Sequence, residues 1–112
     1  MDCLFCSIIK GDIPSNKVYE DEKILAFYDI NPASKVHFLV IPKAHIESAN
    51  EISSENSSAV AYIFEKIPEI ARLAGITNGY RVITNAGEDA CQSVKHLHFH
   101  ILGGEKLPER IV

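Results

Sequence analysis

The chain has 112 residues, of which 46% are hydrophobic and 23% are charged, and its formal net charge is −4. This is the balance of an ordinary globular domain, so we expect a single domain over residues 1–112. The 11 basic residues are scattered, which argues against a nucleic-acid partner, and no apolar run approaches the roughly 20 residues of a membrane span. The start has no basic or apolar signal region, so we expect a cytoplasmic protein.

Short elements separated by polar turns are expected in the first half. Residues 6–10, followed by Gly11, are typical of a short N-terminal helical turn with a glycine stop. Residues 17–30 hold two short runs of strand formers around the polar residues 20–23, which indicates a hairpin. Residues 36–42 are rich in β-branched and aromatic side chains and predict a third strand.

One long helix is expected next. Ser53 or Ser54 is a suitable N-cap, apolar residues then recur at helical spacing to about Ala74, and Gly75 provides a stop. Pro68 lies inside this segment, so a kink or a break is expected there.

Two further strands complete the expected fold, over residues 78–85 and 95–102, with a polar loop over residues 86–94 between them. About five strands, one long helix and a short N-terminal helix, not in strict alternation, indicate an α+β fold with an antiparallel sheet. The long helix can cover one face of such a sheet. The other face is then free for a ligand or a partner subunit.

The stretch KHLHFHILGG, residues 95–104, holds three of the five histidines. Alternation in a strand would turn His96, His98 and His100 to one side and the apolar residues between them to the other. An amphipathic strand whose wet face is histidine is one interpretation. A metal site is a second, and a nucleophile or general base oriented by its neighbours is a third.

Cys3 and Cys6 form a C-x-x-C pair, the spacing with which structural zinc sites commonly begin. A redox dithiol uses the same spacing, but it normally opens a helix after a strand, and that order is missing here. Unrelated thiols are the third possibility. Spacing alone does not select the two further ligands that zinc would need.

Three segments, HLHFHIL, VHFLVIPKAHI and NAGEDACQSV, together resemble the histidine-triad (HIT) family of nucleotide hydrolases and transferases. The chain is most similar to the nucleotide-binding, phosphoramidase-like branch, in its bacterial-type form with an N-terminal C-x-x-C. The resemblance extends from about residue 4 to residue 104. It implies a HIT-like α+β fold and no organic cofactor.

The resemblance implies that His98 is the nucleophile. It would attack the α-phosphorus of a purine nucleoside phosphoramidate, form a nucleotidyl-histidine intermediate, and release AMP or GMP after attack by water. His100 and Ser93 would contact the phosphate oxygens and the departing group, and His37 corresponds to a supporting histidine on a neighbouring strand.

The resemblance also implies a nucleotide site. Asp29 corresponds to the acid that binds the ribose hydroxyls. The apolar base pocket corresponds to Phe5, Ile8, Phe27 and Ile30, and polar positions at the phosphate end correspond to Asn85 and Gln92.

Zinc would be held, by the same resemblance, through Cys3, Cys6, His45 and His96. Such a closed set of two thiolates and two imidazoles suits a structural role. Family members are usually homodimers, so a homodimer is expected. Cys91 departs from the family, which generally has glycine there, and would be strained if the backbone needs a positive φ.

Two other functions remain open at this point. One is the use of the same histidine on dinucleoside polyphosphates or in nucleotidyl transfer. The other is a nucleotide-binding or metal-binding protein whose chemistry is incidental.

Overall fold

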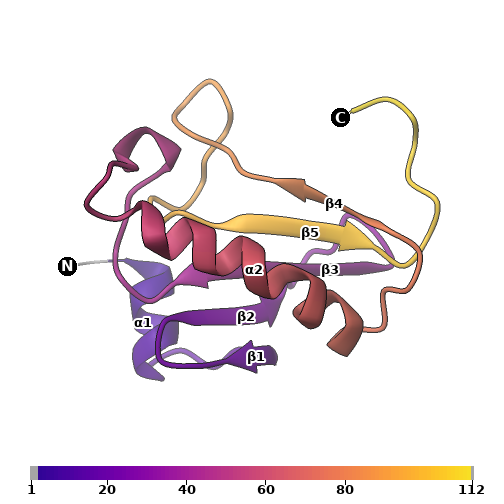
Figure 1. The fold of residues 1–112 in the computed structure, drawn as a ribbon, viewed down its shortest axis with the longest axis horizontal. Coiled ribbons are helices and arrows are strands. Elements are labelled where there is room, and N and C mark those ends of the chain that lie inside the picture. The colour runs from indigo at the N-terminus through magenta and orange to yellow at the C-terminus, as the bar shows by residue number, and fades with distance from the viewer. Residues whose placement is uncertain (1–2, 112) are drawn as a thin grey trace.

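A five-stranded antiparallel sheet forms the centre of the computed structural model, which describes residues 3–111 (Figure 1). The elements are α1 (Leu4–Lys10), β1 (Lys17–Glu20), β2 (Ile24–Tyr28), β3 (Val36–Pro42), the 3₁₀ helix η1 (Ala49–Glu51), α2 (Ser57–Leu73), β4 (Tyr80–Ile83) and β5 (Phe99–Gly103). The strand order β1-β2-β3-β5-β4 inserts β5 between β3 and β4. The expected α+β architecture is therefore confirmed. No helix within the described range is long and apolar enough to cross a membrane.

Helix α2 lies across one face of the sheet (Figure 1). Its buried positions Ile63, Ile67 and Ile70 recur at helical spacing and form one apolar stripe. Alternate strand residues face this stripe, because side chains alternate between the two faces of a sheet. The buried core between α2 and the sheet also contains Ile24, Ala26, Phe38, Val40, Ile46, Ala71, Ile76, Leu97, Phe99 and Ile101.

The start of α2 differs from the expectation. Ser53 caps a separate turn, in which Asn56 Oδ1 accepts a hydrogen bond from the Ser53 amide (2.8 Å) and Ser53 Oγ accepts from the Glu55 amide (3.2 Å). The regular helix begins at Ser57, because Asn56 has a non-helical backbone (φ −129°). The break expected at Pro68 is also absent, since α2 continues to Leu73. Pro68 lies on the exposed side of the helix, while packing of the opposite side against the sheet holds the helix together.

Helix α1 lies against the opposite face of the sheet. The Sγ of Cys3 caps its first turn by accepting a hydrogen bond from the Cys6 amide (3.3 Å), and Gly11 ends it with φ 87°. Phe5 and Ile8 are its buried residues. They pack against the second set of strand side chains, Leu25, Phe27, Leu39 and Ile41. The second face is therefore partly covered by α1.

Strand β5 begins at Phe99, four residues later than expected. The preceding backbone makes other hydrogen bonds: the Leu97 amide donates to the Ile46 carbonyl, and the His98 carbonyl accepts from Thr84 Oγ1 (2.8 Å). His96 and His98 therefore lie in an irregular segment before the strand, and His100 lies within it. The alternation still holds, because Leu97 and Phe99 enter the core under α2.

The loop of residues 86–94 contains a left-handed backbone position. Cys91 has φ 58° and is the one non-glycine residue between positions 3 and 111 with a positive φ. Its amide donates to the Glu88 carbonyl (2.9 Å) and the next amide, of Gln92, donates to the Gly87 carbonyl (3.1 Å), a pair of bonds that requires the left-handed conformation at Cys91. The sequence expectation of strain at Cys91 is thus met by the geometry, because a Cβ is unfavourable in this region.

We predict that Cys91→Gly raises the free energy of unfolding by about 0.5–1 kcal/mol, since relief of left-handed strain exceeds the entropy cost of glycine. Urea unfolding measures this free energy. Cys91→Ala, which removes the thiol and keeps the Cβ, is the matched control and should leave stability within 0.3 kcal/mol or so of the parent. Equal stabilisation by both substitutions would assign the effect to the thiol and contradict the backbone argument.

Candidate active site and metal centre

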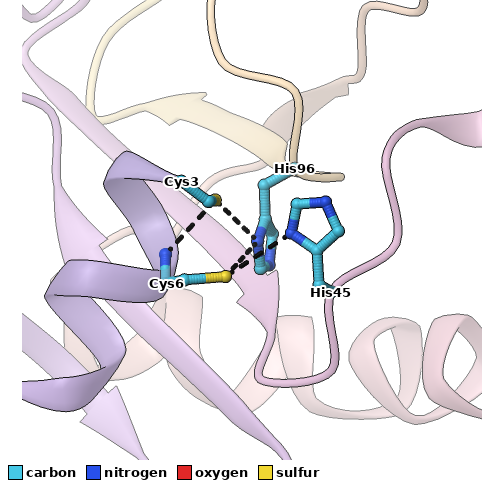
Figure 2. Close-up of side chains that lie close together, drawn as sticks. All are labelled: Cys3, Cys6, His45 and His96. Atoms are coloured by element: carbon cyan, nitrogen blue, oxygen red, sulfur yellow. Dashed lines mark hydrogen bonds between the residues drawn. The ribbon is translucent and has the colours of Figure 1, made fainter. Parts of the chain in front are cut away.

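Four metal-ligand side chains meet at the N-terminal end of α1 (Figure 2). Cys3 and Cys6 come from α1 and its cap, His45 from the segment after β3, and His96 from the segment before β5. Their ligand atoms all lie within 4.8 Å of one another. The Sγ–Nδ1 distances are 3.4 Å for Cys3–His96, 3.6 Å for Cys6–His96 and 3.4 Å for Cys6–His45.

These separations fit zinc. A tetrahedral ion with bonds of about 2.3 Å to sulfur and about 2.0–2.1 Å to nitrogen holds those atoms about 3.5 Å apart. The His96 ring is also set for ligation, because its Nε2 donates to the Pro42 carbonyl (2.8 Å) and leaves the Nδ1 lone pair facing the sulfurs. Burial lowers the pKa of His96, so the ring is neutral at pH 7. The donor set therefore suits a bound divalent cation.

His98 follows two residues later and is buried, with 4% of its surface exposed. Its Nδ1 lies 2.7 Å from the His96 carbonyl oxygen. A carbonyl only accepts, so Nδ1 carries the proton of the neutral ring and Nε2 keeps its lone pair. The backbone thus gives His98 a free ring nitrogen.

A cavity of about 440 Å³ lies between α1, the end of β2 and the histidine segment. Its lining is largely apolar near α1 and polar near the histidines, as in sites for small amphipathic ligands. Eight of the residues expected at the site line it: Phe5, Ile8, Phe27, Asp29, Ile30, Ser93, His98 and His100. His37, Asn85 and Gln92 are not among the lining residues.

His37 lies behind the cavity wall and contacts His100. Its Nδ1 accepts a hydrogen bond from the Ala33 amide (3.0 Å), so its proton is on Nε2, 2.9 Å from His100 Nδ1. His100 Nδ1 is therefore the acceptor, and the proton of neutral His100 is on Nε2. Asp29 Oδ2 lies 3.5 Å from His37 Nε2, and its Oδ1 accepts from the Asn31 amide (2.8 Å).

Asp29, His37 and His100 are also close enough together to be considered as metal ligands. They do not fit a cation. Ligation through His37 Nε2 would move its proton to Nδ1, where it would face the Ala33 N–H at 3.0 Å. The cluster is better described as a directed hydrogen-bond chain, and both imidazoles are held neutral because burial lowers their pKa values.

Gln92 uses its whole side-chain amide within the protein. Its Oε1 accepts from the Gly87 amide (2.9 Å), and its Nε2 donates to the carbonyls of Glu47 (2.7 Å) and Val94 (3.0 Å). These bonds fix the 86–94 loop, which carries Ser93, against the segment that carries His45. Asn85 is half-buried at the start of this loop.

Further cavity residues were not anticipated from the sequence: Leu4, Pro14, Ser15, Asn16, Tyr28, Leu39 and Val94. The 14–16 segment follows α1 and is bound to the sheet through the Asn16 carbonyl, which accepts from the Tyr28 amide (2.9 Å). The Gly11 helix stop and the short link to β1 were the available signals for this return of the chain.

The fold and site define a histidine-triad protein. A family model described as the HIT domain matches residues 10–107, and the chain belongs to this family. HIT proteins bind nucleotides, and family membership supports a hydrolase function.

Individual relatives agree with this assignment. Protein HitA of Neisseria gonorrhoeae is 41% identical over 102 residues, covering 91% of this chain and 95% of that protein. A 14 kDa zinc-binding protein of Zea mays is 42% identical over 106 residues, covering 93% and 83%. The solved structure of a HIT family hydrolase from Clostridium thermocellum superposes with a TM-score of 0.95 at 46% identity, covering 99% and 97% of the two chains.

His100 generates a pH-dependence prediction. Burial is the main cause that lowers its pKa to about 4 from 6.5, and the imidazoles of His98 and His37 act in the same direction. The unfolded chain therefore takes up this proton first as the pH falls, so stability is full above pH 6.5 and is lost between about 6.5 and 4.

We predict that His100→Asn, which keeps an acceptor for His37 and does not titrate, loses about 1–2 kcal/mol less stability than the parent between pH 7 and pH 5. Urea unfolding of both metal-loaded proteins at the two pH values measures the difference. Other groups titrate in both proteins and cancel in the comparison. Identical losses would show that His100 is not held neutral by the fold.

Proposed function

We propose that this chain hydrolyses purine nucleoside phosphoramidates through a nucleotidyl-histidine intermediate on His98. The observation that carries the proposal is the 2.7 Å hydrogen bond from His98 Nδ1 to the His96 carbonyl oxygen. It fixes the proton of a neutral imidazole on Nδ1, so that the Nε2 lone pair is available beside a cavity of about 440 Å³. Such a nitrogen is a nucleophile at pH 7 that needs no deprotonation.

In the first step His98 Nε2 forms a bond to the α-phosphorus, and the phosphorus–nitrogen bond of the phosphoramidate breaks. The departing amine takes its proton from solvent. The neutral His100 Nε2–H donates a hydrogen bond to the departing group, because His37 occupies the other ring nitrogen of His100. In the second step water attacks phosphorus and releases a proton to solvent, the bond to His98 breaks to regenerate the neutral imidazole, and the nucleoside monophosphate leaves. Ser93 and His100 stabilise charge on the phosphate oxygens.

The two ends of the cavity suit the two ends of a purine nucleotide. Phe5, Ile8, Phe27 and Ile30 provide an apolar wall for the base. The Asp29 carboxylate can accept from both ribose hydroxyls. Gln92 acts through the loop that it fixes, and Asn85 lies at the start of the same loop.

The metal centre is proposed to be a structural zinc site. Two thiolates and two imidazoles from Cys3, Cys6, His45 and His96 complete a tetrahedral set, which leaves no position for substrate. Bound zinc would join α1 to the histidine segment. No organic cofactor is proposed.

A homodimer of this single HIT domain, residues 1–112, is the proposed assembly. Strand β4 pairs on one side only, with β5, and leaves a free sheet edge among the described strands. The exposed apolar side chains Phe64, Leu73 and Tyr80 suit contact with a second copy. A cytoplasmic location remains the expectation from the sequence.

We predict that the metal-loaded protein releases AMP from adenosine 5′-phosphoramidate and that His98→Ala slows release at least about 10³-fold. Chromatography of the reaction measures AMP, and calorimetry with AMP verifies that the variant still binds nucleotide. Equal activity would exclude His98 as the nucleophile. If the parent and His98→Ala are both inactive but both bind AMP, the chain is either a nucleotide-binding protein or an enzyme with another substrate. Dinucleoside polyphosphates and nucleotidyl-transfer substrates are then tested.

We further predict about one zinc per chain, and that Cys6→Ser lowers the zinc content and lowers Tm by at least about 5 °C, because the metal stabilises the folded state. Elemental analysis and calorimetry measure the two quantities. Cys91→Ser, at a thiol outside the cluster, is the matched control and should keep full zinc content. Loss of activity on chelation with an unchanged Tm would contradict a structural role.

A further inference from the structure

Phe5 lies between the metal centre and the histidine proposed as nucleophile. It occupies α1 between the ligand positions Cys3 and Cys6. Its ring centroid is 5.1 Å from that of His98 with the planes at 88°, and 5.9 Å from that of His96 with the planes at 71°. Both contacts are edge-to-face, the arrangement that aromatic rings prefer. One side chain thus contacts a metal ligand and the nucleophile.

The His98 ring needs more than its backbone hydrogen bond to be fixed. The bond from Nδ1 to the His96 carbonyl and the covalent Cβ–Cγ bond hold one side of the imidazole, whereas no hydrogen bond among the described residues holds the Nε2 side, which keeps some freedom to tilt by rotation about Cβ–Cγ. Ring contacts remove this freedom, and they come from Phe5 and from His100, whose centroid is also 5.1 Å away. The direction of the Nε2 lone pair therefore depends on where Phe5 is held.

Helix α1 does not hold Phe5 alone. It has seven residues, and a helix of this length is unstable by itself in water. Its positions 3 and 6 are tied to His45 and His96 through the metal cluster (Figure 2). A cation held by these four side chains would therefore fix the segment on which Phe5 lies.

We propose that Phe5 is a positioning residue for His98, and that the metal centre orients the nucleophile through it. This inference rests on the proposed function for its kinetic consequence only. It goes beyond a structural metal, because it assigns to the cation an effect on the angle of one imidazole. It also separates Phe5 from the other apolar residues of the cavity.

Phe27 provides the internal comparison. Both phenylalanines are 5% exposed and both line the cavity. Among the described residues, the Phe27 ring pairs with Phe5 (5.5 Å, 74°) and with no histidine. Loss of the Phe27 ring therefore removes apolar wall, whereas loss of the Phe5 ring removes wall and the contact on His98.

The test compares Phe5→Leu with Phe27→Leu in the zinc-loaded protein, with AMP release from adenosine 5′-phosphoramidate as the kinetic readout. We expect Phe5→Leu to lower kcat by about 5- to 10-fold, the size of one aromatic pair contact. Phe27→Leu should raise KM and change kcat less than about twofold. Phe5→Met, which fills the space without a ring, should repeat the loss in kcat and excludes a cavity effect. Zinc content and Tm verify that each variant is folded and loaded.

A second readout does not use activity. NMR of ¹⁵N-histidine-labelled protein follows exchange of the His98 Nδ1 proton with water. Exchange should accelerate in Phe5→Leu and stay slow in Phe27→Leu. Removal of zinc from the parent should accelerate it as well, and removal from Phe5→Leu should add little, because the link is already lost.

Equal kcat values for the two leucine variants, with slow proton exchange in both, would overturn the proposal. The His98 Nδ1 proton could exchange fast in the zinc-free parent and slowly in zinc-loaded Phe5→Leu. That result would show that zinc acts on His98 by a route other than Phe5. A failure of the proposed function can be distinguished from a failure of the positioning role of Phe5. In that case His98→Ala keeps its activity or no protein is active, while the exchange measurement still decides whether Phe5 holds the ring.

Discussion

The hydrogen bond between His98 Nδ1 and the His96 carbonyl oxygen, 2.7 Å long, is the interaction on which the site depends. It requires the main chain at residue 96 to be turned away from strand pairing, and the same turn brings the His96 ring to the two cysteines. One local change of backbone direction thus supplies a metal ligand and a ring nitrogen with a free lone pair. Strand β5 begins only at Phe99, so residue 96 lies outside the ladder.

The protonation of the site is set by backbone groups. The Pro42 carbonyl holds a proton on His96 Nε2, the His96 carbonyl holds one on His98 Nδ1, and the Ala33 amide donates to His37 Nδ1 and so keeps it unprotonated. Burial also lowers the pKa values of His96, His37 and His100, which keeps the rings neutral. In a neutral ring one nitrogen donates and the other accepts, so the donor side and the acceptor side of each histidine are fixed.

Much of this arrangement could be predicted from the sequence, and the failures have physical causes. Alternation of histidine with apolar residues correctly separated the core side from the cavity side, because the alternation continues through Leu97 and Phe99 outside the ladder. The strand limit could not be read from that pattern, since the backbone bonds at Leu97 and His98 come from segments distant in sequence.

The N-terminal limit of α2 failed for a different reason. Ser53 does cap a turn, since its Oγ accepts from the Glu55 amide, but Asn56 leaves the helical conformation (φ −129°) and the regular helix begins only after it. For the candidate site, the family resemblance named eight of the cavity residues, around α1 and the histidines. It missed the 14–16 segment, which reaches the cavity only because the chain returns after Gly11. The bonds of Gln92 to the Glu47 and Val94 carbonyls could not be predicted from the sequence pattern either.

The insertion of β5 between β3 and β4 has a consequence for the order of folding. The hydrogen bond between His37 and His100 joins residues 63 positions apart, whereas β1, β2 and β3 are joined by short turns. Closing a long loop costs more chain entropy than forming a hairpin, so the β3–β5 ladder is expected to form after the β1–β3 meander. The histidines then meet in the late part of folding. A compact intermediate that lacks this ladder would contain the apolar wall of the cavity but not the assembled histidines.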